Sequence, residues 1–213
     1  MTGVILAGGA SRRMGSNKAL LIHRYGRIIE VIYRTLAKLF AEVIVVTNSP
    51  EQYPFLPCRK VPDIYPGHGI VSGIHAGLSQ CSGTGIFVVG CDMPLLQGKL
   101  IRHLMSLAEG VDVVLPVSVG GFEPLHAVYR KECLPSLEEL IQNGNQRVLS
   151  LLPQVRVREV HSDEIAFFDR WGDSFVNINT PDDYYRLRSA GFEQRAADCN
   201  REPLATVRFF YER

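Results

Sequence analysis

The chain has 213 residues, and its 23 Lys and Arg against 22 Asp and Glu give a net charge of +1. Hydrophobic residues make up 46% and charged residues 21%, an ordinary globular composition that excludes a disordered, collagen-like or coiled-coil protein. The near-zero charge gives no electrostatic reason to expect nucleic acid as a partner. No apolar run approaches the ~18 residues of a membrane span, so no membrane association is expected.

The cysteines and the N-terminus indicate a cytoplasmic protein. The five cysteines are odd in number, and none of them forms a C-x-x-C pair or accompanies a histidine cluster at zinc spacing. We therefore expect free thiols in a reducing cytosol. The apolar stretch near the N-terminus has no basic region before it and stops at Gly8-Gly9, so it predicts a first strand rather than a signal peptide.

Apolar runs and helical periodicity alternate along the chain. They predict, in chain order, strand 3–7, a loop over 10–19, a helix through 29–40, strand 43–47, a short strand near Val61, helix 70–81, strand 86–89, a helix through 100–107 and strand 111–117. Because the strands are apolar throughout and alternate with helices, we predict a doubly wound α/β fold with a mostly parallel sheet covered on both faces.

The second half departs from this alternation after Gly120-Gly121. Residues 125–129 are expected to return antiparallel, a helix follows through 134–141, and the partial alternation over 151–160 suggests an edge strand whose arginines face water. Thr180-Pro181 with an acid at position 183 is a typical helix start. We expect one domain over residues 1–192 and a separate polar, Arg-rich tail over 193–213.

The first chemical motif directly follows the first strand. It is not a Walker A loop, because Lys18 does not follow a glycine, and it is not G-x-G-x-x-G. Its glycines nevertheless allow backbone N–H groups to approach phosphate oxygens, and Arg12, Arg13 and Lys18 supply positive charge. A position after the first strand, where α/β proteins bind ligands, favours a phosphate site over a turn with solvated basic residues.

The form of this motif is Leu6-Ala7-Gly8-Gly9, then Arg13-Met14-Gly15, then Lys18-Ala19-Leu20-Leu21. It resembles the signature of nucleotidyltransferases of the sugar-nucleotide pyrophosphorylase type, and is most similar to the molybdenum cofactor guanylyltransferase (MobA) family over about residues 3–190. The resemblance implies a Rossmann-like nucleotidyltransferase domain with a nucleotide-binding half over 1–95 and an acceptor-binding half over 96–192. It also implies that Lys18 and Arg13 are catalytic, and that nucleotide contacts come from Leu6, Ala7, Gly8, Gly9, Arg12 and Lys18.

The second motif, Gly90-Cys91-Asp92-Met93-Pro94, ends a buried strand. A lone carboxylate at such a strand end is suited to Mg²⁺, which prefers oxygen ligands and triphosphates. The same residue would also suit the cap of the next helix, and the chemistry alone leaves the two alternatives about even. The resemblance implies that Asp92 is the Mg²⁺ ligand, and so a catalytic and nucleotide-binding residue.

The third motif runs from Asp63 to Ile74. Its Gly67, Gly69 and Gly73 permit close approach of the backbone before a helix. The family loop reads Gly-x-Gly-Pro-Leu-x-Gly, whereas Ile70 stands here in place of Pro. The resemblance implies that this segment helps to hold the nucleotide, with Asp63 matching a family aspartate.

Asn48 follows the second strand and resembles the asparagine that contacts the base in the family. A turn-forming Asn before Ser49-Pro50 is an equally good interpretation.

The fourth set of candidates lies in the second half. Alternation in Asn177-Ile178-Asn179 places both amides on one face of an extended segment, although a turn and helix cap would explain them as well. The family has a matching Asn-x-Asn-Thr-Pro segment and a matching arginine. The resemblance therefore implies that Arg147, Asn177 and Asn179 bind the acceptor.

The resemblance implies that GMP passes from GTP to the phosphate of Mo-molybdopterin, with Mg²⁺ as cofactor and pyrophosphate released. Transient contacts with proteins of cofactor biosynthesis or molybdoenzyme maturation are expected. Two alternatives stay open. One is transfer of cytidylyl or another nucleotidyl group to a related phosphorylated acceptor, and the other is a nucleotide-binding protein without catalysis.

Overall fold

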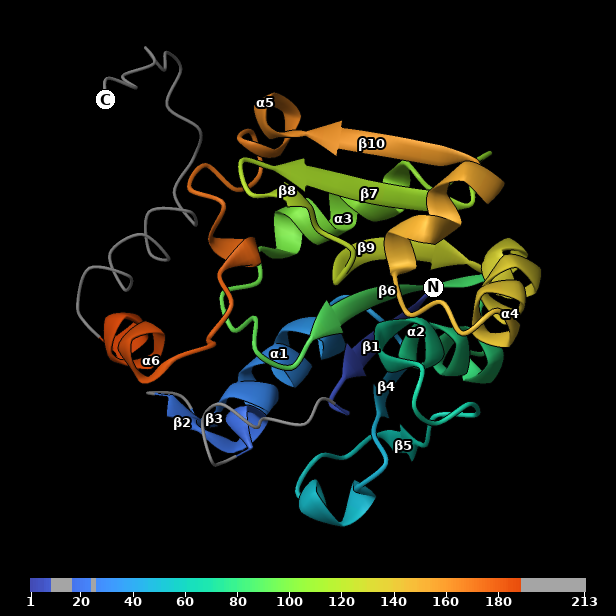
Figure 1. Ribbon diagram of the computed structural model, residues 1–213. Helices are drawn as coiled ribbons and strands as arrows, with labels where there is room; N and C mark the ends of the chain where they lie inside the picture. The colour runs from blue at the N-terminus through green and yellow to red at the C-terminus, as the bar shows by residue number, and fades with distance from the viewer. Residues whose placement is uncertain (9–16, 24–25, 189–213) are drawn as a thin grey trace.

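Strands rich in β-branched residues form one open eight-stranded sheet (Figure 1). The computed structural model describes residues 1–8, 17–23 and 26–188. The strand order is β10-β7-β9-β6-β1-β4-β5, with β8 paired to β7. The strands are β1 (Thr2–Leu6), β4 (Val43–Val46), β5 (Arg59–Val61), β6 (Gly85–Gly90), β7 (Val113–Ser118), β8 (Gly121–Phe122), β9 (His126–Arg130) and β10 (Val157–His161).

The sheet is mostly parallel, as predicted. β1 pairs in parallel with β4 and β6, β5 with β4, and β10 with β7. β9 runs antiparallel between β6 and β7, which confirms the predicted return of the chain. The short β8 is also antiparallel to β7.

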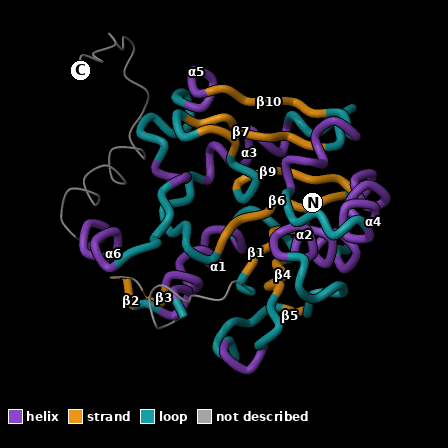
Figure 2. The backbone as a smooth tube through the Cα atoms, viewed as in Figure 1, coloured by secondary structure: helices purple, strands orange, loops and turns teal. Residues whose placement is uncertain are grey.

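Helices cover both faces of this sheet (Figure 2). They are α1 (Ile28–Ala37), α2 (Gly69–Gln80), α3 (Gly98–Ser106), α4 (Leu134–Gln142), α5 (Ser162–Ile165) and α6 (Pro181–Arg188). Alternate strand residues point to opposite faces. Ile5 and Phe87 thus pack with α1 and α3, whereas Val4 and Ile86 pack with α2 and α4.

Five 3₁₀ helices join these elements in the described part of the chain. They are η1 (Lys18–Leu20), η2 (Pro50–Gln52), η3 (Lys131–Cys133), η4 (Val148–Gln154) and η5 (Asp173–Phe175). A short hairpin with two residues in each strand lies beside α6 (Figure 1); its strands are β2 (Ile22–His23) and β3 (Gly26–Arg27). The Tyr184 hydroxyl of α6 donates to the Ile22 carbonyl.

Several predicted boundaries were wrong. The helix expected to run to Phe40 ends at Ala37, although Phe40 still stacks on Phe87 with the ring centroids 6.0 Å apart. The edge strand expected from residue 151 begins only at Val157, because η4 occupies the first part of that segment. Arg156 is not simply solvated, since its guanidinium lies 2.7 Å from the Asp112 carboxylate.

The register aligns the carboxyl ends of the central strands. Leu6 lies beside both Val46 and Gly90, and Val46 lies beside Val61. The residues that follow these four positions therefore gather at one edge of the sheet, the carboxyl edge. Such an edge is where open α/β sheets bind their ligands.

Four cysteines are free, as expected: Cys58, Cys81, Cys91 and Cys133. The fifth, Cys199, lies outside the described residues, as does the predicted tail over 193–213. In the described ranges, no helix is both long and apolar enough to cross a membrane.

Candidate active site

Asp92 lies in the turn that follows β6, two residues beyond the strand. A Cβ at Gly90 would come within 2.7 Å of Asp92 Oδ1, so a side chain at Gly90 would force the Asp92 carboxylate to shift. Burial raises the pKa of Asp92, while the charge of Lys18 acts to lower it. The helix-cap alternative for Asp92 is wrong, since the N-cap of α3 is Gln97.

Lys18 begins η1, and Asn17 fixes that turn. The Asn17 Oδ1 accepts from the Ala19 N–H at 3.1 Å, while its Nδ2 donates to Gln52 Oε1 at 2.6 Å and to the Tyr53 hydroxyl at 2.9 Å. The Lys18 ammonium then donates to Asn179 Oδ1 at 2.7 Å. A predicted catalytic residue and a predicted acceptor residue, 161 positions apart, are thus in direct contact.

The two predicted acceptor asparagines have different partners. Asn177 donates from Nδ2 to the Phe175 carbonyl at 3.2 Å, whereas Asn179 accepts from Lys18. Ile178 between them is buried, and its N–H donates to the Asp92 carbonyl at 2.9 Å. The expected helix cap is also present, because the Thr180 hydroxyl accepts from the Asp183 N–H at 3.1 Å. Thr180 therefore caps α6, while the Asn179 side chain accepts a hydrogen bond from Lys18.

Asn48 and Asp63 bond to each other at the carboxyl ends of β4 and β5. The Asn48 Nδ2 donates to Asp63 Oδ2 at 2.9 Å, and the Asp63 N–H donates to Asn48 Oδ1 at 3.0 Å. A turn does follow Asn48, with the Ser49 N–H donating to the Thr47 hydroxyl at 3.1 Å. The pair thus places two predicted nucleotide-binding residues side by side at the edge.

The glycine loop before α2 contains two residues in the left-handed region. Gly67 has φ +92° and Gly69 has φ +60°, values that a side chain would disfavour. Gly73 has a different role from the predicted one. A Cβ at Gly73 would lie 3.2 Å from the Leu6 side chain, so this glycine allows α2 to pack closely on β1.

Arg147 lies on the other flank of the carboxyl edge from Asn179. Its side chain is exposed, and its neighbour Gln146 donates from Nε2 to the Gly67 carbonyl at 2.9 Å. That contact places the segment beside the loop that enters α2, whereas Lys18 and Ile178 belong to the α1 side of the sheet. The three predicted acceptor residues therefore do not form one cluster.

The first motif is described only at its two ends. The Ala7 N–H donates to the Val46 carbonyl at 2.9 Å, and the Leu6 carbonyl accepts from the Cys91 N–H at 3.1 Å. Among the described residues, no atom lies within 4 Å of where a Cβ on Gly8 would be. Gly9, Arg12 and Arg13 lie outside the described residues.

Asp92 fits a magnesium ion that is shared with a nucleotide. Among the described residues, no group of three or more His, Cys, Asp or Glu could hold a metal alone. Mg²⁺ is usually bound through one or two carboxylates, with phosphates and water completing its six ligands. A single half-buried carboxylate beside a lysine is a suitable donor set for such a shared ion.

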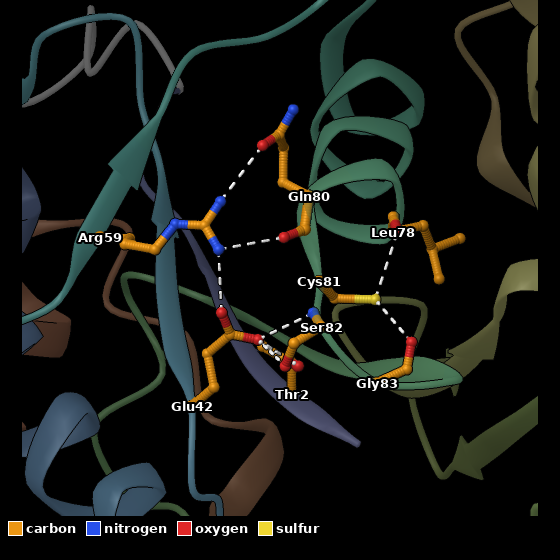
Figure 3. Close-up of polar contacts among 8 residues, drawn as sticks. All are labelled: Thr2, Glu42, Arg59, Leu78, Gln80, Cys81, Ser82 and Gly83. Carbon is orange, nitrogen blue, oxygen red and sulfur yellow. Dashed lines mark hydrogen bonds and ion pairs between the residues drawn. The ribbon is translucent and has the colours of Figure 1, made fainter.

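A hollow of about 780 Å³ lies at the opposite, amino edge of the sheet. The residues that line it include Tyr33, Phe40, Glu42, Leu56, Arg59 and Lys60. Its charged groups already have partners within the protein. Arg59 pairs with Glu42 at 2.9 Å (Figure 3), and the Lys60 ammonium donates to the Leu56 carbonyl. The carboxyl edge, where Asn48, Asp63 and Asp92 follow the ends of β4, β5 and β6, is therefore the candidate site.

Sequence reasoning missed three residues that organise this edge. Asn17 fixes Lys18, Ile178 links Asp92 to the acceptor segment, and Gln146 holds the Gly67 loop. Only Asn17 carried a local signal, since asparagine favours helix N-caps. The bonds of the other two join segments that are far apart in the sequence.

The fold and this edge define an α/β protein of the nucleotidyltransferase class. The family model described as "MobA-like NTP transferase domain" matches residues 3–159, and the chain belongs to this family. A probable molybdenum cofactor guanylyltransferase from Pelotomaculum thermopropionicum is 40% identical over 187 residues, covering 88% of this chain and 91% of the relative. A molybdenum cofactor guanylyltransferase from Desulfosudis oleivorans is 31% identical over 192 residues, covering 89% and 95%.

The solved structures agree with this assignment. The crystal structure of molybdopterin-guanine dinucleotide biosynthesis protein A from Archaeoglobus fulgidus has a TM-score of 0.78 and 28% sequence identity, and the match covers 88% of this chain and 97% of that chain. The predicted fold and family are therefore confirmed, and the chain is a nucleotidyltransferase by family.

Proposed function

We propose that the protein transfers GMP from GTP to the phosphate of Mo-molybdopterin, giving molybdopterin guanine dinucleotide and pyrophosphate. One observation carries the proposal: the 2.7 Å contact between Lys18 and Asn179, near Asp92, supports a site shared by the proposed nucleotide-binding and acceptor-binding segments. Relatives at 31–40% identity that bear the name molybdenum cofactor guanylyltransferase support it.

The chemistry is in-line displacement at the α-phosphorus. An oxygen of the acceptor phosphate forms the new P–O bond, the bond to the β-phosphate oxygen breaks, and pyrophosphate leaves with that electron pair. The nucleophile is already anionic, so positioning and charge neutralisation suffice without a strong base. Mg²⁺, when bound, supplies Lewis-acid stabilisation of the phosphates. We propose that Asp92 holds this ion.

The other residues bind and orient the substrates. Lys18, with Arg12 and Arg13, would hold the β- and γ-phosphates and the leaving pyrophosphate. The backbone from Leu6 to Gly9 and the Asn48–Asp63 pair would seat the guanosine. Asn177 and Asn179 on one flank and Arg147 on the other would face the acceptor. This assignment keeps residues 1–95 as the nucleotide half and 96–192 as the acceptor half.

We further propose that the enzyme acts in the cytosol, in line with its free thiols. Its dinucleotide product must pass to other proteins, so transient contacts with cofactor-biosynthesis or molybdoenzyme-maturation proteins belong to the same proposal.

Pyrophosphate release tests the proposal directly. The purified protein is incubated with Mg²⁺ and each of GTP, CTP, ATP and UTP, with and without Mo-molybdopterin. Release only with GTP and the acceptor is the expected result. Release with CTP would keep the mechanism but change the nucleotide, and tight GTP binding without release would indicate a non-catalytic binding protein.

A further inference from the structure

The backbone around Asn179 is fixed by hydrogen bonds, both at the preceding residue and at Asn179 itself. The preceding residue, Ile178, is buried and donates its N–H to the Asp92 carbonyl at 2.9 Å. The N–H of Asn179 itself donates to Asp183 Oδ2 at 3.0 Å, within the cap of α6. An exposed side chain on a backbone fixed in this way can keep a defined direction.

The segment leading to Asn179 is also tied to the start of α3. The buried Asp169 carboxylate accepts from the N–H groups of Asp173 at 3.0 Å and Ser174 at 2.8 Å. The Ser174 hydroxyl in turn accepts from the Gln97 N–H, at 3.0 Å, just before α3. These bonds make the acceptor segment a rigid support that reaches across to Lys18.

Lys18 has the opposite character. Its backbone is fixed by Asn17, but its side chain has four rotatable bonds, and holding it in one direction costs conformational entropy. An ammonium can only donate hydrogen bonds, so it needs an oxygen acceptor. The Asn179 Oδ1 supplies that acceptor at 2.7 Å, and the Lys18 charge also acts on Asp92.

We propose that Asn179 is a positioning residue for Lys18. Its carboxamide holds the ammonium beside Asp92 before the triphosphate arrives, so that less side-chain freedom is lost when the phosphates bind. The role rests on the proposed function but differs from acceptor binding. It requires that Asn179 affects GTP affinity even when no acceptor is present.

The test is equilibrium binding of GTP with Mg²⁺, measured by calorimetry without acceptor. The proteins are the wild type, Asn179→Ala, Lys18→Met and the double variant. The Lys18–Asn179 hydrogen bond is charge-assisted but exposed to water, so Asn179→Ala is expected to weaken GTP binding about 3- to 10-fold. In the Lys18→Met background the same change should have less than about a 2-fold effect, because residues that act together are non-additive.

The matched control is Asp182→Asn, an exposed residue in the first turn of α6, which is expected to bind GTP as the wild type does. Unchanged GTP affinity in Asn179→Ala with lost acceptor turnover would overturn the inference, because Asn179 would then be an acceptor contact only. An equal loss in both backgrounds would also overturn it. Failure of the wild type to bind GTP would instead overturn the proposed function itself, and the inference with it.

Discussion

The carboxylates at the two edges of the sheet differ in how many hydrogen bonds the protein gives them. At the amino edge, Glu42 accepts from the Ser82 N–H and hydroxyl, the Thr2 hydroxyl and the Arg59 guanidinium, at 2.8–3.0 Å (Figure 3). At the carboxyl edge, Asp92 lies near Lys18, whose ammonium is bonded to Asn179.

The pKa values reflect this difference. Burial acts to raise the pKa of Glu42, but its hydrogen bonds from Ser82, Thr2 and Arg59 outweigh burial and lower it to about 2. For Asp92, burial outweighs the charge of Lys18 and raises the pKa. A carboxylate satisfied by the protein stabilises the fold, whereas one that is half-buried with few protein partners is suited to bind substrate groups.

The largest expected effect is at the carboxyl edge. Asp92→Ala should lower kcat about 10²-fold or more, because one preorganised electrostatic group is lost. Its free energy of unfolding should stay close to that of the wild type, since the raised pKa indicates no net stabilisation of the charge. Pyrophosphate release and urea unfolding check both expectations. Turnover close to the wild-type rate would remove the metal assignment.

A second prediction concerns His126, which is buried at the start of β9 and pairs with Val89 near the carboxyl end of β6. Neither ring nitrogen has a hydrogen-bond partner in the described structure, and the rings of Phe87 and Phe175 lie edge-on at 5.0 and 5.2 Å. Burial lowers the pKa of His126 to about 3 from its ordinary 6.5. The unfolded chain therefore binds the proton more tightly, so stability is full above pH 6.5 and falls as the pH drops toward 3.

This linkage should remove roughly 3 kcal/mol of unfolding free energy between pH 7 and pH 4. His126→Leu should flatten that part of the pH profile, measured by urea unfolding at a series of pH values. Parallel profiles for the two proteins would show that His126 is not the source of the loss.

At the amino edge, Glu42→Gln should lower the free energy of unfolding by about 1–2 kcal/mol at pH 7, since a network of charge-assisted bonds is weakened. Because the folded pKa is depressed, the wild-type advantage is present above pH 4.5 and disappears as the pH falls toward 2. The kcat of the variant should be unchanged. Loss of turnover without loss of stability would contradict the division between the two edges.

The smallest expected effect is at the Asn48–Asp63 pair. Asn48→Ala removes two hydrogen bonds at the strand ends, at 2.9 and 3.0 Å, and should raise KM for GTP about 3- to 10-fold with little change in kcat. Steady-state kinetics with GTP varied at saturating acceptor provide the measurement. A fall in kcat with an unchanged KM would mean that Asn48 does not contribute to nucleotide binding.

Local patterns predicted most of the fold. The β-branched run at Val43–Val46 and the periodicity from Ile29 to Leu36 identify a strand and a helix without any tertiary information. The two-residue strands β2 and β3 escaped prediction because two residues carry no periodicity. A proline-containing 3₁₀ helix, η4, replaced the first part of the expected edge strand.

The site was only partly predictable. Strand ends and glycines indicate where Asp92 and Lys18 lie, since these signals are local. The bond between Lys18 and Asn179 spans 161 residues, and the bond between Glu42 and Thr2 spans 40. Such pairings depend on how the strands order themselves in the sheet, which no local pattern contains. The same applies to the separation of Arg147 from Asn179.

Hydrogen–deuterium exchange of the wild type with and without GTP and Mg²⁺ tests the central claim most directly. The account predicts new protection of the backbone amides of Gly8, Asn48 and Asp92, which lie just beyond strand ends at the carboxyl edge. The amino-edge segments 40–43 and 56–60, which line the 780 Å³ hollow, should exchange as before. Protection confined to that hollow would contradict the assignment of the nucleotide to the carboxyl edge.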